Sequence, residues 1–99
     1  MVTENWIDIE NNLGRFLGIE KHCMEKITKV VFFNYDCWFS YNTLIMVQDK
    51  IHGNGRKLLT KHHIDSNTTS KHAQYMCGQD RKTRLMLLDN ETYHFLKIN

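Results

Sequence analysis

The sequence predicts an α+β domain: an N-terminal helix packed on an antiparallel sheet of about four or five strands, with one short inserted helix. Helical apolar spacing near the N-terminus, β-branched and aromatic residues in the middle, and turn residues between short apolar runs support this. We expect one domain, 1–99, with a helical N-terminal segment (1–25) and a sheet (26–99) that contains a helix at about 67–77.

The N-terminal segment has the spacing of an amphipathic helix. Trp6, Ile9 and Leu13 recur at steps of three and four, which places them on one side of a helix. Gly18 suits the position just past a helix end. Residues 19–25 are compatible with a second short helix or with a link.

The stretch Lys26–Asp49 is dense in β-branched and aromatic residues, which favour strands. Its run Asn34–Asp36 is typical of a break between strands. We therefore expect two strands, at about 26–33 and about 37–48.

Turn and capping residues follow this stretch. His52–Gly55 contains Asn-Gly, a strong hairpin signal, so a strand at about 56–62 should return antiparallel. The polar run Asp65–Thr69 offers side-chain oxygens that can accept from the free N–H groups of a helix start. Gly78 suits the end of that helix, which we expect at about 67–77.

The C-terminal residues read as a hairpin of strands 83–88 and 92–98 around a turn at Asp89–Glu91. If 92–98 lies at the sheet edge, it could pair with its counterpart in a second copy. Both a monomer and a homodimer are therefore compatible with the sequence.

The side chains capable of chemistry do not match a catalytic or metal-binding pattern. Ser70 and His72 stand two apart on the predicted helix and do not face each other. His62 and His63 are adjacent on a predicted strand and point to opposite faces. The three cysteines are an odd number at wide spacing. We expect a protein that is not an enzyme and that binds no metal or cofactor.

Charge is unevenly distributed along the chain. Residues 1–20 carry four acidic side chains and one basic one, a net charge of −3, whereas residues 50–84 carry eight basic and two acidic ones, a net charge of +6. Such asymmetry can mark a contact surface, although lysines also protect strand edges. The candidate partner-binding residues are Arg56, Lys57, Lys61, Lys71, His72, Arg81, Lys82 and Arg84.

Targeting signals are not evident. No run approaches the roughly 18 apolar residues of a membrane helix, and the N-terminus, MVTENWIDIE, has acidic residues where a signal peptide would be basic and apolar. We therefore expect a cytoplasmic protein that does not associate with a membrane.

Two segments, SYNTLIMVQD (Ser40–Asp49) and IDSNTTSKHAQYM (Ile64–Met76), carry a resemblance. Together they resemble an uncharacterised family of small proteins from phages and bacterial mobile elements. That family has a Tyr-x-Thr strand and a later Thr-Thr-Ser-(Lys/Arg)-His junction that opens a helix. The matching positions here are Tyr41, Thr43, Thr68, Thr69, Ser70, Lys71 and His72. The chain departs from the family at Asp65-Ser66, where an aromatic residue before serine is usual.

The resemblance implies a context more than an activity. Small phage proteins without catalytic motifs commonly bind a host protein, including nucleic-acid-handling enzymes of antiviral defence. We therefore expect a non-enzymatic phage-type accessory protein in the cytoplasm of a bacterial host cell, which binds and modulates a host protein. Inhibition of an antiviral defence system (anti-CRISPR or anti-restriction) is the specific form of this hypothesis. The alternative is a small nucleic-acid-binding module that uses the basic segment 50–84.

Overall fold

The computed structural model of the chain describes residues 1–52 and 55–98. In chain order the elements are β1 (Thr3–Asn5), α1 (Trp6–Glu10), β2 (Phe16–His22), β3 (Ile27–Phe32), β4 (Tyr35–Ser40), β5 (Thr43–Asp49), β6 (Lys57–Leu59), the 3₁₀-helix η1 (Lys61–Ile64), α2 (Asn67–Cys77), α3 (Arg81–Asp89) and β7 (His94–Lys97). The predicted Asn-Gly turn falls on Gly53 and Asn54, which lie outside the described residues.

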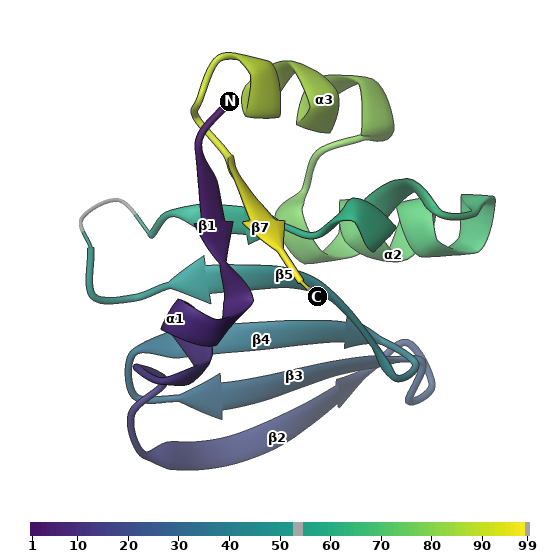
Figure 1. The fold of residues 1–99 in the computed structure, drawn as a ribbon. Coiled ribbons are helices and arrows are strands. Elements are labelled where there is room, and N and C mark those ends of the chain that lie inside the picture. Colours follow the sequence, from purple (N-terminus) through teal and green to yellow (C-terminus); the bar gives the residue numbers. More distant parts are fainter. Residues whose placement is uncertain (53–54, 99) are drawn as a thin grey trace.

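The strands form one mixed sheet of seven strands in the order β1-β7-β6-β5-β4-β3-β2 (Figure 1). Neighbours from β2 to β6 pair antiparallel, whereas β7 runs parallel to both β6 and β1. The predicted antiparallel sheet of four or five strands is therefore wrong. The physical reason is the connection from β6 to β7, which runs through η1, α2 and α3 and returns the chain in the same direction, as a crossover does.

The predicted N-terminal helix is mostly replaced by strands. Only Trp6–Glu10 is helical, and β1 and β2 flank it. Gly14 has φ +79°, and a Cβ there would lie 3.0 Å from the side-chain amide nitrogen of Asn34. The chain turns at Gly14, and the backbone N–H of Asn34, which donates to the carbonyl of Leu13, holds this turn against the β3–β4 connection. The apolar residues at helical spacing still pack against the sheet, with Ile9 buried.

The predicted strand at 37–48 is a hairpin. β4 ends at Ser40 and β5 begins at Thr43, and Tyr41 takes the left-handed conformation with φ +53°. No glycine marks this turn, so the local sequence did not reveal it. The strand expected at about 56–62 is shorter, because Thr60 caps η1 by accepting from the backbone N–H of His62.

The helix expected at 67–77 is confirmed as α2, Asn67–Cys77. The Ser66 hydroxyl accepts from the backbone N–H of Thr69 at 3.1 Å, and Gly78 ends the helix with φ +78°. The strand expected at 83–88 is wrong, since these residues belong to α3. Its start is capped by the carboxylate of Asp80, which accepts from the Thr83 N–H at 2.8 Å.

Two apolar cores lie on opposite faces of the sheet. Trp38 belongs to the core that contains residues of α2 and α3, and its neighbour Cys37 belongs to the core on the α1 side. Among residues 1–52 and 55–98, no helix has the length and apolar character needed to span a bilayer.

Candidate functional site

Two turns meet at one end of the sheet. The backbone N–H of Tyr41, in the β4–β5 turn, donates to the carbonyl of Lys26, which follows the β2–β3 turn, at 2.8 Å. Cys23, Met24 and Glu25 have φ of 51°, 57° and 69°, in the same left-handed region as Tyr41. Non-glycine residues adopt this conformation only where the surrounding structure holds them in it. The two turns therefore form a well-defined tip.

The helix α2 is attached to this tip through His72. Its Nδ1 atom lies 2.6 Å from the hydroxyl oxygen of Ser40, and its ring lies 5.9 Å from the ring of Tyr41. Burial, and next the nearby Lys26 cation, lower the pKa of His72 below the ordinary histidine value. The imidazole is therefore neutral at pH 7 and can share a hydrogen bond with the Ser40 hydroxyl.

A second contact between α2 and the sheet is aromatic. The rings of His22, Trp38 and Tyr75 form a cluster. The centroid of His22 lies 5.3 Å from that of Trp38 and 5.6 Å from that of Tyr75, and the latter two are 6.5 Å apart. His22 Nδ1 and the Tyr75 hydroxyl are 2.8 Å apart, which fixes the orientation of Tyr75. The indole nitrogen of Trp38 is buried and has no hydrogen-bond partner among the described residues.

Large side chains at this end are exposed even though their backbones are fixed. Met24 is 87% exposed, Tyr41 59% and Tyr75 51%. Tyrosine and methionine are enriched where proteins contact one another, since they combine apolar area with a polar or polarizable group. We call this region the tip surface, which consists of Met24, Lys26, Tyr41, Asn42, His72 and Tyr75.

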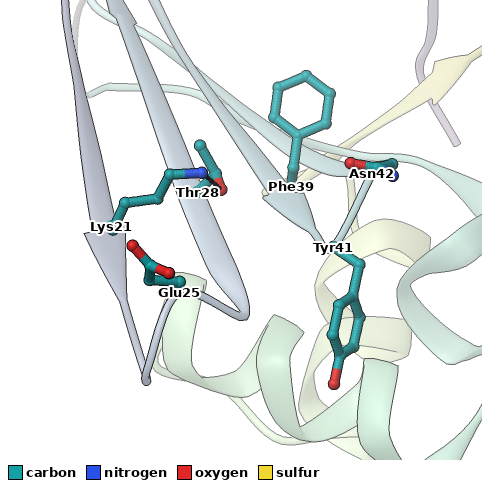
Figure 2. Close-up of a pocket in the computed structure, with 6 residues that line it drawn as sticks. All are labelled: Lys21, Glu25, Thr28, Phe39, Tyr41 and Asn42. Carbon is teal, nitrogen blue, oxygen red and sulfur yellow. Dashed lines mark hydrogen bonds between the residues drawn. The ribbon is translucent and has the colours of Figure 1, made fainter.

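A shallow pocket borders the tip surface. Its volume is about 360 Å³, and it is lined by Lys21, Glu25, Thr28, Phe39, Tyr41 and Asn42 (Figure 2). Phe39 and Tyr41 point in opposite directions from the end of β4. Tyr41 borders the pocket and also contacts His72 of α2. The Lys21 ammonium donates to the Thr28 hydroxyl at 3.0 Å. The pocket thus adds an apolar ring and a few polar groups to the same end of the molecule.

Serine and histidine are the residue types of a catalytic nucleophile and its general base, but the surroundings of Ser40 and His72 do not suit that role. Ser40 is only 4% exposed, and in the described part of the chain no carboxylate hydrogen-bonds to His72. Ser70, two residues before His72 in the sequence, accepts from Nη2 of Arg84 at 2.7 Å instead. Both hydroxyls therefore link parts of the fold.

Two of the predicted partner-binding residues are engaged inside the protein. Arg84 is fully buried and donates to Nδ1 and the carbonyl of His63, to the Ser70 hydroxyl and to the carbonyl of Gln79. Arg56 forms ion pairs with Glu4 and Asp49, each with a shortest distance of 2.6 Å. Neither residue presents a free cation to a partner.

The remaining predicted residues lie on four different elements, β6, η1, α2 and α3. Lys57 lies at the start of β6 with its ammonium 5.7 Å from the Tyr93 ring, and Arg81 and Lys82 begin α3. Lys61 is exposed in η1, and Lys71 is exposed on α2. Only Lys71 and His72, which are adjacent on α2, lie at or beside the tip surface.

Sequence reasoning missed several residues of this site. Tyr75 stands three positions after His72, so a helical reading could have placed both on one side of α2. Met24 falls in the segment 19–25, for which the sequence left two interpretations open. The contact of Ser40 with His72 joins β4 to α2 and had no local signal.

Comparisons with known proteins add no relative. The chain matched no protein-family model, no curated protein and no solved structure. Among the described residues, no group of three or more histidine, cysteine, aspartate or glutamate side chains is placed to hold a metal ion.

Proposed function

We propose that this protein is a non-enzymatic, phage-type accessory protein that binds and modulates a bacterial host protein through the tip surface. The observation that carries the proposal is the exposure of three large side chains, Met24, Tyr41 and Tyr75, on fixed turns and on a helix. Rigid, exposed tyrosines contribute contact area at low entropic cost. The family resemblance supports the phage context, because Tyr41 and His72 are among its matching positions.

A protein partner fits this surface better than a nucleic acid does. Single-stranded nucleic acids need a continuous basic groove beside the stacking aromatics. The basic residues of segment 50–84 instead come from several elements, and among them Arg84 is buried and Arg56 is paired with carboxylates. At the tip itself, Lys26 is accompanied by the acidic Glu25.

The proposed host partner is an enzyme of antiviral defence, such as a CRISPR or restriction component. A protein without a catalytic constellation acts on such an enzyme by occupying its surface, so inhibition should follow the stoichiometry of the complex. The resemblance supports this class of partner.

The experiment is affinity capture from a bacterial lysate with matched variants. Tyr41→Asn and Met24→Asn replace the large side chains by one that tolerates positive φ. Tyr75→Ala removes the third large side chain, which lies on α2. Met86→Ala removes a similarly exposed side chain, 57% exposed, from α3 outside the tip surface. We expect a specific stoichiometric partner that Met86→Ala retains and the tip variants lose.

Two outcomes would overturn the proposal. One is the recovery of no stoichiometric partner over a range of salt concentrations. The other is a partner that the tip variants retain as well as the original chain does. Retention on immobilised oligonucleotide that falls steeply with salt would favour the nucleic-acid alternative instead.

A further inference from the structure

The strand β2 lies at one end of the sheet, along its lower margin in Figure 1. It is seven residues long, whereas β1, at the other end, has three. In the part of the chain that the structure describes, β2 pairs only with β3. Residues 92–98, the edge expected from the sequence, include β7, which lies between β1 and β6 and is not an edge. A homodimer formed by strand pairing must therefore use a different strand.

The register identifies which backbone groups of β2 are free. Because the Tyr41 N–H donates to Lys26, the even-numbered residues of β3 direct their backbone groups toward β4. The odd-numbered residues of β3 then direct theirs toward β2. Ile19 and Lys21 stand opposite the even-numbered Val30 and Thr28. Their N–H and C=O groups consequently point away from the sheet.

The side chains of β2 add apolar area to this edge. Phe16 is 55% exposed, Leu17 48% and Ile19 57%. The ladder with β3 shifts between Phe16 and Gly18, so Leu17 is an extra, bulged residue. As a result, Phe16 and Ile19 stand opposite the even-numbered Phe32 and Val30 and share one face of the sheet. A long edge with exposed apolar residues is a template for another strand.

We propose that two copies of this chain pair antiparallel through β2 and join their sheets into one. The arrangement is centred on Gly18 opposite Gly18, where the absence of side chains allows close approach. In this register the bulged Leu17 is passed over in both strands, so Ile19 lies opposite Phe16 and Glu20 opposite Arg15. Apolar and oppositely charged side chains then meet twice about the two-fold axis.

The self-complementarity of the strand is what selects a second copy as the occupant. Shifting the pairing to Ile19 opposite Ile19 places Lys21 opposite Phe16 and His22 opposite Arg15, which loses both matches. The inference does not rest on the proposed host partner, because β2 and the tip surface use different side chains. Tip variants such as Tyr41→Asn should leave the dimer unchanged.

The experiment is sedimentation equilibrium of the purified chain over a range of concentrations, with variants in β2. Proline at position 19 removes an N–H that points away from β3, so the internal ladder keeps its hydrogen bonds. We expect the original chain to be dimeric at micromolar concentration and Ile19→Pro to be monomeric with an unchanged circular dichroism spectrum. Ile19→Thr keeps the N–H and should weaken the dimer less.

Charge reversal tests the register even if Ile19→Pro fails to fold. Arg15→Glu or Glu20→Arg alone should raise the dimer Kd about fivefold or more, and the double reversal should restore it. A monomer at all concentrations would overturn the inference. So would a dimer that Ile19→Pro leaves intact, or one in which the two reversals do not compensate. If the chain is monomeric and Ile19→Pro abolishes capture of a host protein, the β2 edge binds that protein, and the proposed pairing of two copies is wrong.

Discussion

The hydroxyl oxygen of Ser40, at the end of β4, lies 2.6 Å from Nδ1 of His72 on α2. The two residues are 32 positions apart in the sequence. The contact positions α2 against the β4–β5 turn and so fixes His72 beside Tyr41. A polar link that is half buried in this way contributes both to stability and to the geometry of the tip surface.

Replacing Ser40 with alanine should destabilise the fold without changing it. The substitution leaves Nδ1 of His72 without its partner in a partly buried place, which costs about 1–2 kcal/mol of unfolding free energy. Urea denaturation measures the loss. Thr43→Ala, at the exposed start of β5, is the control and should shift stability by no more than about 0.5 kcal/mol. Equal stability of the two variants would show that the Ser40 contact is not maintained in solution.

Gly78→Ala tests the end of α2. Gly78 has φ +78°, and a Cβ at this position would have no atom within 4 Å, so the cost comes from the backbone conformation alone. We expect a loss of about 1 kcal/mol, measured by thermal unfolding. Gly78→Asn is the matched control, since asparagine adopts the left-handed conformation at a lower cost than alanine does. A loss for Gly78→Ala no larger than that for Gly78→Asn would contradict the αL cap.

Arg84 should be among the residues that contribute most to stability. Arg84→Leu removes a buried cation and leaves four acceptor groups on His63, Ser70 and Gln79 unpaired. We expect a loss of about 3 kcal/mol or more in urea denaturation. Arg84→Lys keeps the charge but cannot reach all four acceptors, so its loss should be smaller.

The control for this prediction is Arg81→Leu, one turn earlier on the same helix and exposed. Its effect should stay within about 0.5 kcal/mol. A stability of Arg84→Leu equal to that of Arg81→Leu would mean that the buried guanidinium is no better than an apolar side chain of similar size.

The sequence predicted α2 well because the signals for that helix are local. Ser66 and Gly78 act on backbone groups within a few residues, so their effect is visible without the rest of the fold. The same kind of signal existed for α3 in Asp80 and Thr83, but the short run Leu85–Leu88 reads equally well as a strand or a helix.

The topology could not be read locally. β7 has the composition of a strand, yet its neighbours β6 and β1 are set by contacts between distant segments. Likewise, the N-terminal spacing at Trp6, Ile9 and Leu13 predicted burial against the sheet but not the turn at Gly14, which depends on Asn34.

The candidate site was predictable only in part. Of the predicted partner-binding residues, His72 belongs to the tip surface, and its ring lies 5.9 Å from that of Tyr41, which the sequence did not single out as a binding residue. The basic residues grouped by charge come from several elements, and two of them, Arg56 and Arg84, are engaged inside the protein, because charge asymmetry along a chain does not fix where the charges lie. Tyr75 and Met24 became candidates only once their exposure was known.

Stability should fall as the pH drops from about 6.5 to about 4, and His63 is the main reason. Burial, and next the cations of Arg84 and Arg81, lower the pKa of His63 to about 4, whereas the unfolded chain has a histidine pKa of about 6.5. Between these values the unfolded chain binds a proton that the folded chain does not, so the unfolding free energy decreases by up to about 3 kcal/mol. Urea midpoints measured across this range test the slope.

The variant His63→Asn isolates the contribution of His63, since the asparagine oxygen lies near the position of Nδ1 and can still accept from Nε of Arg84. Its stability should change much less between pH 6.5 and 4. A smaller slope of the same sign should persist, because burial and Lys26 also lower the pKa of His72. If the variant and the original chain show the same slope, His63 is protonated in the folded protein and its hydrogen bond from Arg84 is not retained.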